Sequence, residues 1–283
     1  MLSTIKYFII FICCIVVSCA ADHKNKSGKK YIFPYHLEII EDVWLLPDEL
    51  HEISGMVALN DSMMVCVNDE NGILFNFNLN TAKTDTLVVF GPKGDYEGLA
   101  YASPSFYVVS SSGTIFIIDQ NLKTGFFLTP LNKHNDIEGI CYLPATNIFL
   151  LAAKGSPVAG IHSNLEYKSV FAFDPVKKKT GKDPFFTIDV QKQADNKKKN
   201  KFFSPSDIAF DPVDSVIYCI SAHTHQILVS TTNGQVLYLE ELNKNNFIQP
   251  EGICFDRNYN LYISTEGKKN PARIYRFRRE KIL

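Results

Sequence analysis

The chain has 283 residues, and its 29 Lys and Arg residues nearly balance its 30 Asp and Glu residues. The resulting net charge of −1 argues against a nucleic-acid partner, because phosphate binding needs a basic surface. Apolar residues make up 46% of the chain, which is enough for the core of one large all-β domain.

The N-terminus predicts a lipoprotein signal peptide over residues 1–18. Lys6 precedes the apolar run Tyr7–Val17, and Ser18 and Cys19 follow this run. A plain secretory site has small residues at A-x-A spacing, whereas Cys in the first mature position resembles the lipobox of bacterial lipoproteins. We therefore expect acyl chains on Cys19 to anchor the protein to a membrane of the bacterial cell envelope, in the periplasm or at the cell surface. The alternatives are an ordinary signal peptide and an uncleaved anchor.

Residues 19–35 are expected to form the lipidated Cys and a flexible tether, because residues 21–30 are polar and have no apolar period. From residue 36 to residue 283 the chain consists of short strand-like runs separated by turn residues. Asn233-Gly234 is the strongest of the hairpin signals in this part. We assign residues 36–283 to one β domain.

One short phrase recurs through this domain. It consists of an acidic or polar residue, a spacer, then Glu-Gly, Ser-Gly or Ser-Asp, and a small apolar run. Successive copies are 41 to 45 residues apart, except for one step of 68 residues. A period near 40 to 45 with strand-like filler is typical of a β-propeller. The five copies are Glu52–Val57, Asp95–Ala100, Asp136–Cys141, Ser204–Ala209 and Gln249–Cys254.

The repeat predicts five blades of four strands, with one strand missing from the last blade. The run Leu37–Leu45 is strand-like and unassigned, so we expect it to join the last blade and close the ring, which removes two exposed edges. The step of 68 residues leaves a sixth blade as the alternative. Two blades would need about 80 residues at this period, so we interpret the step as one blade with enlarged loops.

The acidic residues of the phrase are the candidate site. In a propeller, the loop that enters each innermost strand borders one end of the central channel, so equivalent positions of all blades become neighbours. The residues expected to converge there are Glu97, Glu138 and Glu251, with Asp207 in place of Gly in blade four. Glu52, Asp95 and Asp136 precede their phrases, and a second tier containing Glu70 and Glu266 follows the next strand.

Several carboxylates around one narrow axis repel one another and require a counter-charge unless they are protonated. A hard cation with oxygen ligands, calcium above all, is the simplest solution. Zinc is not expected, because no His or Cys cluster has the spacing of zinc ligands. The alternative is that each acidic side chain hydrogen-bonds the backbone of a neighbouring blade and locks the blades together.

The sequence has no nucleophile motif and no nucleotide-binding fingerprint. His51, His134, His223 and His225 are candidates for a base acting on a metal-bound water, although a surface role is the alternative for each. The four Cys residues of the domain lie in strand-like runs at repeat-equivalent positions. This pattern predicts packing rather than disulfides.

Six motifs together resemble the SdiA-regulated family of bacterial proteins, over roughly residues 37–278. The resemblance implies a five-bladed β-propeller related to NHL-repeat proteins and to calcium-dependent lactonases of the paraoxonase type. It also implies calcium binding and frequent membrane association, without an established activity. Family members tend to carry Lys-Glu after the third-blade strand, where this chain has Lys154-Gly155. The motifs are HEISGMV at 51–57, VNDENGILFNFNL at 67–79, GDYEGLAY at 94–101, DIEGICY at 136–142, SPSDIAFDP at 204–212 and QPEGICFD at 249–256.

We therefore expect a lipid-anchored envelope propeller that binds calcium and an unknown small-molecule or protein ligand at the channel face. A calcium-dependent esterase or lactonase and a protein-docking scaffold are the alternatives. An enzyme needs an open metal site with a His within reach, whereas a scaffold needs an exposed apolar patch.

Overall fold

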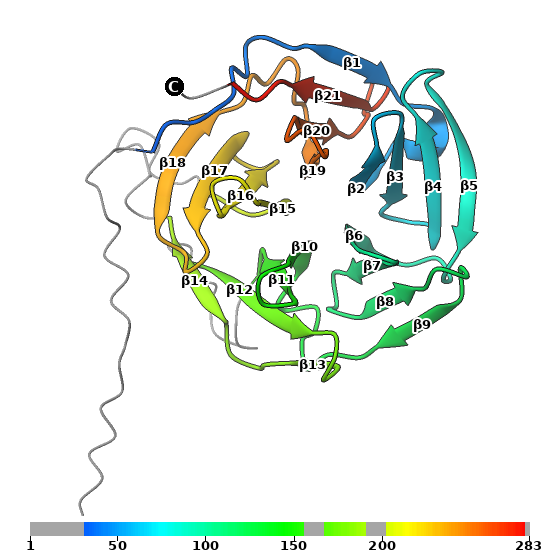
Figure 1. Ribbon diagram of the computed structural model, residues 1–283, viewed down its shortest axis with the longest axis vertical. Helices are drawn as coiled ribbons and strands as arrows, with labels where there is room; N and C mark the ends of the chain where they lie inside the picture. Colours follow the sequence, from blue (N-terminus) through cyan, green and yellow to red (C-terminus); the bar gives the residue numbers. More distant parts are fainter. Residues whose placement is uncertain (1–30, 156–166, 191–201, 281–283) are drawn as a thin grey trace, which may run out of the picture. The chain divides into compact units, whose positions relative to one another are not determined.

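Five antiparallel sheets surround a common axis in the computed structural model, which describes residues 31–155, 167–190 and 202–280 (Figure 1). The innermost strand of each sheet begins in one copy of the recurrent phrase. The five-bladed all-β propeller predicted from the spacing of that phrase is therefore confirmed.

Each blade is built mainly from consecutive antiparallel strands. Blade one contains β2 (Ile53–Asn60), β3 (Met63–Asn68), β4 (Ile73–Asn78) and β5 (Lys83–Val89). Blade two contains β6 (Tyr96–Ala102), β7 (Ser105–Ser110), β8 (Ile115–Ile118) and β9 (Thr124–Phe127). Blade four contains β15 (Asp207–Asp211), β16 (Val216–Ser221), β17 (Gln226–Thr231) and β18 (Val236–Glu241).

Blade three accounts for the step of 68 residues. Its strands are β10 (Ile137–Leu143), β11 (Ile148–Ala153), β12 (Tyr167–Asp174), β13 (Lys179–Thr180) and β14 (Phe186–Asp189). Both β13 and β14 pair with β12, so the outer position is shared by two short strands. The described residues of this step thus form one sheet, as the sequence predicted.

The last blade is closed by the N-terminal strand, which confirms the predicted ring closure. Its sequence order is β1 (Asp42–Leu45), then β19 (Pro250–Phe255), β20 (Leu261–Thr265) and β21 (Arg273–Phe277). β1 pairs antiparallel with β21, with Trp44 opposite Ile274. A short 3₁₀ helix, η1 (Asp48–Leu50), leads from β1 into blade one.

The middle strands read as continuous apolar runs because neighbouring blades cover both of their faces. In β16 every residue is buried, and β11 is buried except at its first residue. The blades are joined by turns of the expected chemistry. Gly234 follows Asn233 and adopts a φ of +88°, a conformation that most other residues disfavour. The four Cys of the described residues are free and buried, as the packing interpretation predicted.

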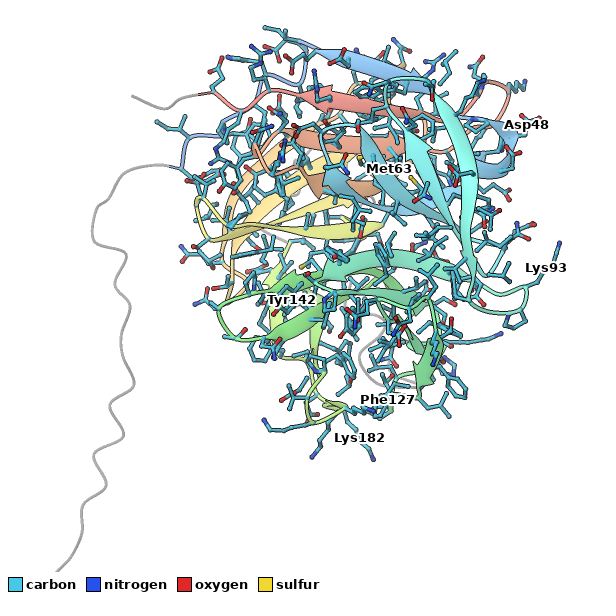
Figure 2. The ribbon with its side chains drawn as sticks, turned by 45° about the vertical axis from the view of Figure 1, so that its right-hand side comes forward. Asp48, Met63, Lys93, Phe127, Tyr142 and Lys182 are labelled. Atoms are coloured by element: carbon cyan, nitrogen blue, oxygen red, sulfur yellow. The ribbon has the colours of Figure 1, made fainter. Side chains whose placement is uncertain are left out.

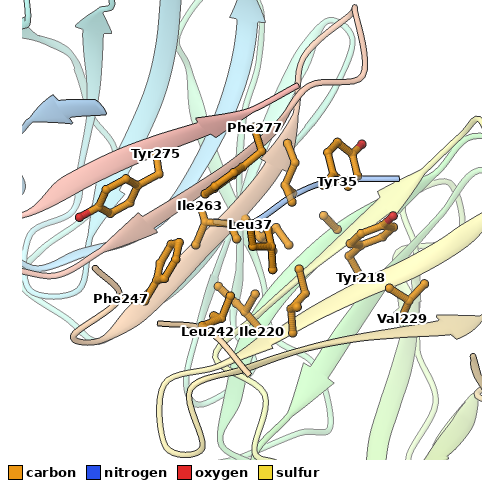
Figure 3. Close-up of a cluster of buried hydrophobic side chains, with 14 of the residues drawn as sticks. Tyr35, Leu37, Tyr218, Ile220, Val229, Leu242, Phe247, Ile263, Tyr275 and Phe277 are labelled. Atoms are coloured by element: carbon orange, nitrogen blue, oxygen red, sulfur yellow. The ribbon is translucent and has the colours of Figure 1, made fainter. Parts of the chain in front are cut away.

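The compact unit begins at Tyr31, so the tether predicted over residues 19–35 is wrong for its last five residues. Aromatic side chains alternate there, and they pack against blades four and five. The Phe33 ring is stacked on Tyr238 with centroids 4.6 Å apart, and Tyr35 is buried beside Tyr218. Figure 3 shows the buried cluster to which Tyr35 belongs, together with Leu37.

The predicted signal peptide, the lipidated Cys19 and the start of the tether lie outside the described residues. No helix in the described ranges is long and apolar enough to cross a membrane.

Candidate functional site

The glutamates of the phrase lie at the start of the inner strands, each at an irregularity in the strand pairing. The register of β6 with β7 shifts between Tyr96 and Gly98, which places Glu97 at a β-bulge. The equivalent shifts in blades three and five place Glu138 and Glu251 at bulges. A bulge re-aims the side chain of its extra residue, so the same local geometry presents all three carboxyl groups at one end of the channel.

Glu97 has the most perturbed carboxyl group with a resolved value at this end. Burial raises the pKa of Glu97 to about 10, and repulsion from Glu138, a hydrogen bond with Asp95 and the Asp95 and Glu251 charges raise it further. Asp95 itself accepts a hydrogen bond from the Ser111 hydroxyl of the same blade. Glu97 is therefore protonated at neutral pH unless a cation lies beside it.

Glu138 is balanced by a lysine of its own blade. Lys154 Nζ lies 2.9 Å from Glu138 Oε1, and Glu138 is buried. Burial raises the pKa of Glu138 to about 7, although the Lys154 charge and hydrogen bond act in the opposite direction. The neighbouring Lys168 is buried and donates to Lys154 O and to Ser204 Oγ at 3.2 and 3.3 Å.

Glu251 and Glu266 form the part of the site that blade five contributes. Burial raises the pKa of Glu251 to about 8, with further increases from Glu266 and Glu138. Burial also raises the pKa of Glu266 to about 7, with contributions from Asp69 and Glu52. Gln249 Nε2 donates to Glu266 Oε2 at 2.6 Å and thereby ties the two tiers of this blade together.

The remaining acidic residues lie at the edge of this end. Burial and the neighbouring Glu52 raise the pKa of Asp69 to about 6. Glu52 and Glu70 are exposed, and Glu70 Oε2 lies 4.0 Å from Lys93 Nζ. Sequence reasoning therefore placed these acidic residues at the correct end, but Glu52 and Glu70 are less enclosed than the three bulge glutamates.

Asp207 has a different environment from the other acidic residues. Its Oδ1 accepts from Ile208 N at 2.7 Å, and its Oδ2 accepts from Ile253 N at 2.9 Å. Ile140 N is a further backbone donor to this fully buried carboxyl. Burial raises the pKa of Asp207 well above its ordinary value, although these hydrogen bonds act in the opposite direction. The side chain thus joins the inner strands of blades three, four and five, which is the blade-locking role.

Glycines occupy the position of Asp207 in the other blades because the inner strands approach closely there. A Cβ on Gly55 would lie 2.7 Å from Leu99 N, and one on Gly98 would lie 3.0 Å from Gly139 Cα. A Cβ on Gly139 would lie 2.6 Å from Asp207 Oδ1. We call this layer, formed by Gly55, Gly98, Gly139, Asp207 and Gly252, the waist of the channel.

A cavity of about 370 Å³ opens beside the carboxyl groups, between blades four and five. Its lining includes Glu251, Gln249, His223, Lys154 and Lys268. His225 also lines it, with Nε2 3.1 Å from Ile248 O. Of the other candidate bases, His134 is exposed and His51 is half-buried beside Gly267. The chemistry of this cavity is therefore polar and of mixed charge.

Among the described residues, no group of three or more His, Cys, Asp or Glu side chains converges closely enough to hold a metal ion as arranged. The donor chemistry is nevertheless that of a hard-cation site, because the partly enclosed groups are carboxyl oxygens. Lys154 is the cation that the chain itself places against Glu138.

Sequence reasoning missed Lys154, which lies at a repeat-equivalent position. The residue directly after the second strand of blades one, three and five is Asp69, Lys154 and Glu266, respectively. Extending the second tier to blade three would have identified the lysine. Lys168 has no such signal, because β12 follows a long insertion.

A family model described as SdiA-regulated matches residues 52–278 of the chain. No curated protein matches it. Among solved structures, the glutaminyl cyclase of Myxococcus xanthus has a TM-score of 0.56 at 14% identity, covering 87% of this chain and 97% of its own. Luciferin-regenerating enzyme has a TM-score of 0.50 at 11% identity, covering 84% and 95%. A protein of unknown function from Bacteroides thetaiotaomicron has a TM-score of 0.50 at 12% identity, covering 78% and 55%. At these identities the structural neighbours share the fold alone.

Proposed function

The chain belongs to the SdiA-regulated family, and we propose that it is a lipid-anchored β-propeller of the bacterial cell envelope that binds calcium and a polar ligand at the carboxyl end of its channel. The observation that carries this proposal is the convergence of Glu97, Glu138, Glu251 and Glu266. Burial and mutual repulsion raise the pKa of all four.

Calcium suits this group because it takes carboxylate oxygens in flexible geometries. Glu97, Glu138 and Glu251 would hold it, with Glu266 from the second tier. Asp207 is left out of this set because both of its oxygens accept backbone hydrogen bonds. A bound divalent cation would supply the positive charge that keeps these glutamates ionised at neutral pH.

Lys154 competes with a cation for Glu138, since its ammonium group already forms an ion pair with that carboxylate. The variant Lys154→Met should therefore bind calcium more tightly than the wild type does. Lys268→Met is the matched control, because Lys268 lines the same cavity and is exposed.

The proposal is tested by calcium titration of chelator-treated protein, followed by calorimetry and thermal melting. A ligand that binds only the folded state stabilises it by about 2.7 kcal/mol at a hundredfold excess over its Kd. Glu97→Gln and Glu138→Gln should each weaken this response, whereas Glu38→Gln, at an exposed glutamate paired with His36, should not. Absence of calcium binding to the wild type would refute this function.

The lipid anchor has its own test. Cys19→Ala should move the protein from the membrane fraction to the soluble fraction, or block its maturation, because the acyl chains would have no attachment site. Unchanged fractionation of this variant would contradict the lipoprotein interpretation.

A hydrolase is the second candidate, because His223 and Glu251 line the same cavity beside the acidic group. A panel of esters and lactones should then be cleaved only with calcium, and His223→Gln should lower kcat without changing calcium affinity. If no member of the panel is cleaved, the binding function is favoured over the enzyme.

A further inference from the structure

The opposite end of the channel is built from four successive layers of repeat-equivalent residues. The first is the waist, and the next holds the large apolar residues Met56, Leu99, Ile140, Ile208 and Ile253. The third layer holds the small or short side chains Val57, Ala100, Cys141, Ala209 and Cys254. The fourth holds Ala58 and the aromatic residues Tyr101, Tyr142, Phe210 and Phe255.

All residues of the last three layers line one cavity of about 480 Å³. The small third layer makes room within the ring, and the fourth layer surrounds the opening with half-buried aromatic side chains. Tyr142, one of these rim residues, is labelled in Figure 2. Ligand pockets typically have about 300 to 1,000 Å³ and mostly apolar walls with few polar groups, so this cavity has the size and lining of a small-molecule site.

The polar groups at its edge are already paired, and they favour an uncharged occupant. Arg257 forms an ion pair with Asp61, and its Nε donates to Asp61 Oδ1 at 2.7 Å. Asp256 accepts from Asn258 N and from Asn260 N, both at 2.8 Å. Two carboxylates and one guanidinium leave no unbalanced positive charge among these rim groups for an anionic ligand, and the apolar walls would not solvate a cation.

We propose that this apolar cavity is a second binding site, which takes one uncharged, largely apolar small molecule with an aromatic or branched body. The rim aromatics would pack against the ligand, and the small third layer would admit it into the ring. Because the waist lies between this cavity and the carboxyl groups, the site does not depend on the proposed calcium function.

The first test uses the uncharged fluorescent probe N-phenyl-1-naphthylamine with the purified full chain. We expect saturable binding of one probe per chain, with the blue-shifted emission of an apolar site. Ala100→Leu and Ala209→Leu should weaken binding about tenfold or more, because the added carbons fill the space that the probe needs. The matched control is Ala102→Leu, at a half-buried position on β6 outside the cavity lining. Circular dichroism melts show whether each variant is folded.

The second test needs no variant, because the wild-type cysteines divide into two pairs. Cys141 and Cys254 line the cavity and are 6% and 7% exposed, whereas Cys66 and Cys219 are fully buried outside it. The small uncharged reagent methyl methanethiosulfonate should label the first pair faster, as mapped peptide by peptide. Saturating probe should protect that pair and leave the labelling of Cys66 and Cys219 unchanged.

Calcium chelation and Glu97→Gln should leave probe binding unchanged, which separates this site from the carboxyl end. Absence of saturable probe binding, or equal labelling of all four cysteines with no protection, would overturn the proposal. It would also be overturned if sedimentation showed that copies of the chain associate through this face and bind the probe only when dissociated.

Discussion

At the scale of the residue, Asp207 shows how one position of a repeat acquires a distinct role. It stands where the other four blades have glycine, at the layer where the inner strands approach most closely. Its carboxylate accepts from the backbone of blades four and five and receives a further hydrogen bond from blade three. The side chain therefore replaces direct strand contact with hydrogen bonds across the axis.

Asp207→Asn should lower the free energy of unfolding by about 1 to 3 kcal/mol, because the amide nitrogen cannot accept from the amide that it faces. Urea unfolding measures this loss, and Asp48→Asn, at an exposed position of η1 (Figure 2), is the control. Calcium affinity should be unchanged. Loss of calcium binding without loss of stability would instead make Asp207 a ligand.

The candidate site was predictable at this scale only in part. The spacing of the phrase placed Glu97, Glu138 and Glu251 at one end of the channel, because blade symmetry brings equivalent residues together. The sequence does not distinguish a carboxylate that faces the channel from one that binds backbone, so Asp207 was grouped with the glutamates. The difference depends on which strands meet at the waist, a property of three blades at once.

At the scale of the element, β1 closes the ring by pairing with β21 and contacting blade one. Trp44 Nε1 donates to Leu79 O of blade one at 2.7 Å, and its ring is stacked on Tyr262 of the last blade. Arg276 on β21 lies over the same ring and forms ion pairs with Glu41 and Asp42. One tryptophan thus connects the first and last blades.

Trp44→Ala should destabilise the fold by about 3 kcal/mol, the lower end of the range for a truncated core aromatic, since Trp44 is half-buried. Trp44→Phe keeps most of the ring packing and loses the hydrogen bond, so its loss should be about 1 kcal/mol. Denaturant unfolding followed by circular dichroism distinguishes the two. If both variants unfold at the wild-type midpoint, β1 does not hold the ring closed.

The blade count and the closure were predictable because they follow from repeat spacing and from the need to cover strand edges. The start of the compact unit was not, since Tyr31, Phe33 and Tyr35 alternate over too few residues to stand out beside a polar tether. Their place is decided by aromatic partners about 185 to 225 residues later, such as Tyr218, Tyr238 and Phe255. Such long-range packing leaves no local signal.

At the scale of the whole molecule, the propeller separates two chemistries along one axis. Each inner strand begins at the polar end, passes through the waist and ends at the apolar cavity, so five short strands repeat the same gradient. The close approach at the waist holds both ends in place. Ligands at one end therefore meet carboxyl groups, and ligands at the other meet aromatic rings.

The carboxyl end predicts how stability depends on pH in the metal-free protein. The pKa values of Glu138 and Glu266 are raised to about 7, that of Glu251 to about 8 and that of Glu97 to about 10, from an ordinary value of 4.5. Between pH 4.5 and these values the folded state binds more protons than the unfolded state does. Their contribution to stability is therefore fully present below pH 4.5 and is lost as pH rises through the folded values.

We expect the free energy of unfolding of chelator-treated protein to fall from pH 5 to pH 8, by up to about 1.4 kcal/mol per pH unit for each carboxyl that is protonated only when folded. Saturating calcium should reduce this slope, because it stabilises the ionised glutamates. Glu97→Gln should also reduce it, since the amide does not titrate, and Glu38→Gln should not. Urea unfolding at each pH gives the slopes. A chelator-treated protein whose stability rises over this range would show that the glutamates are already ionised, with Lys154 and solvent as sufficient counter-charge.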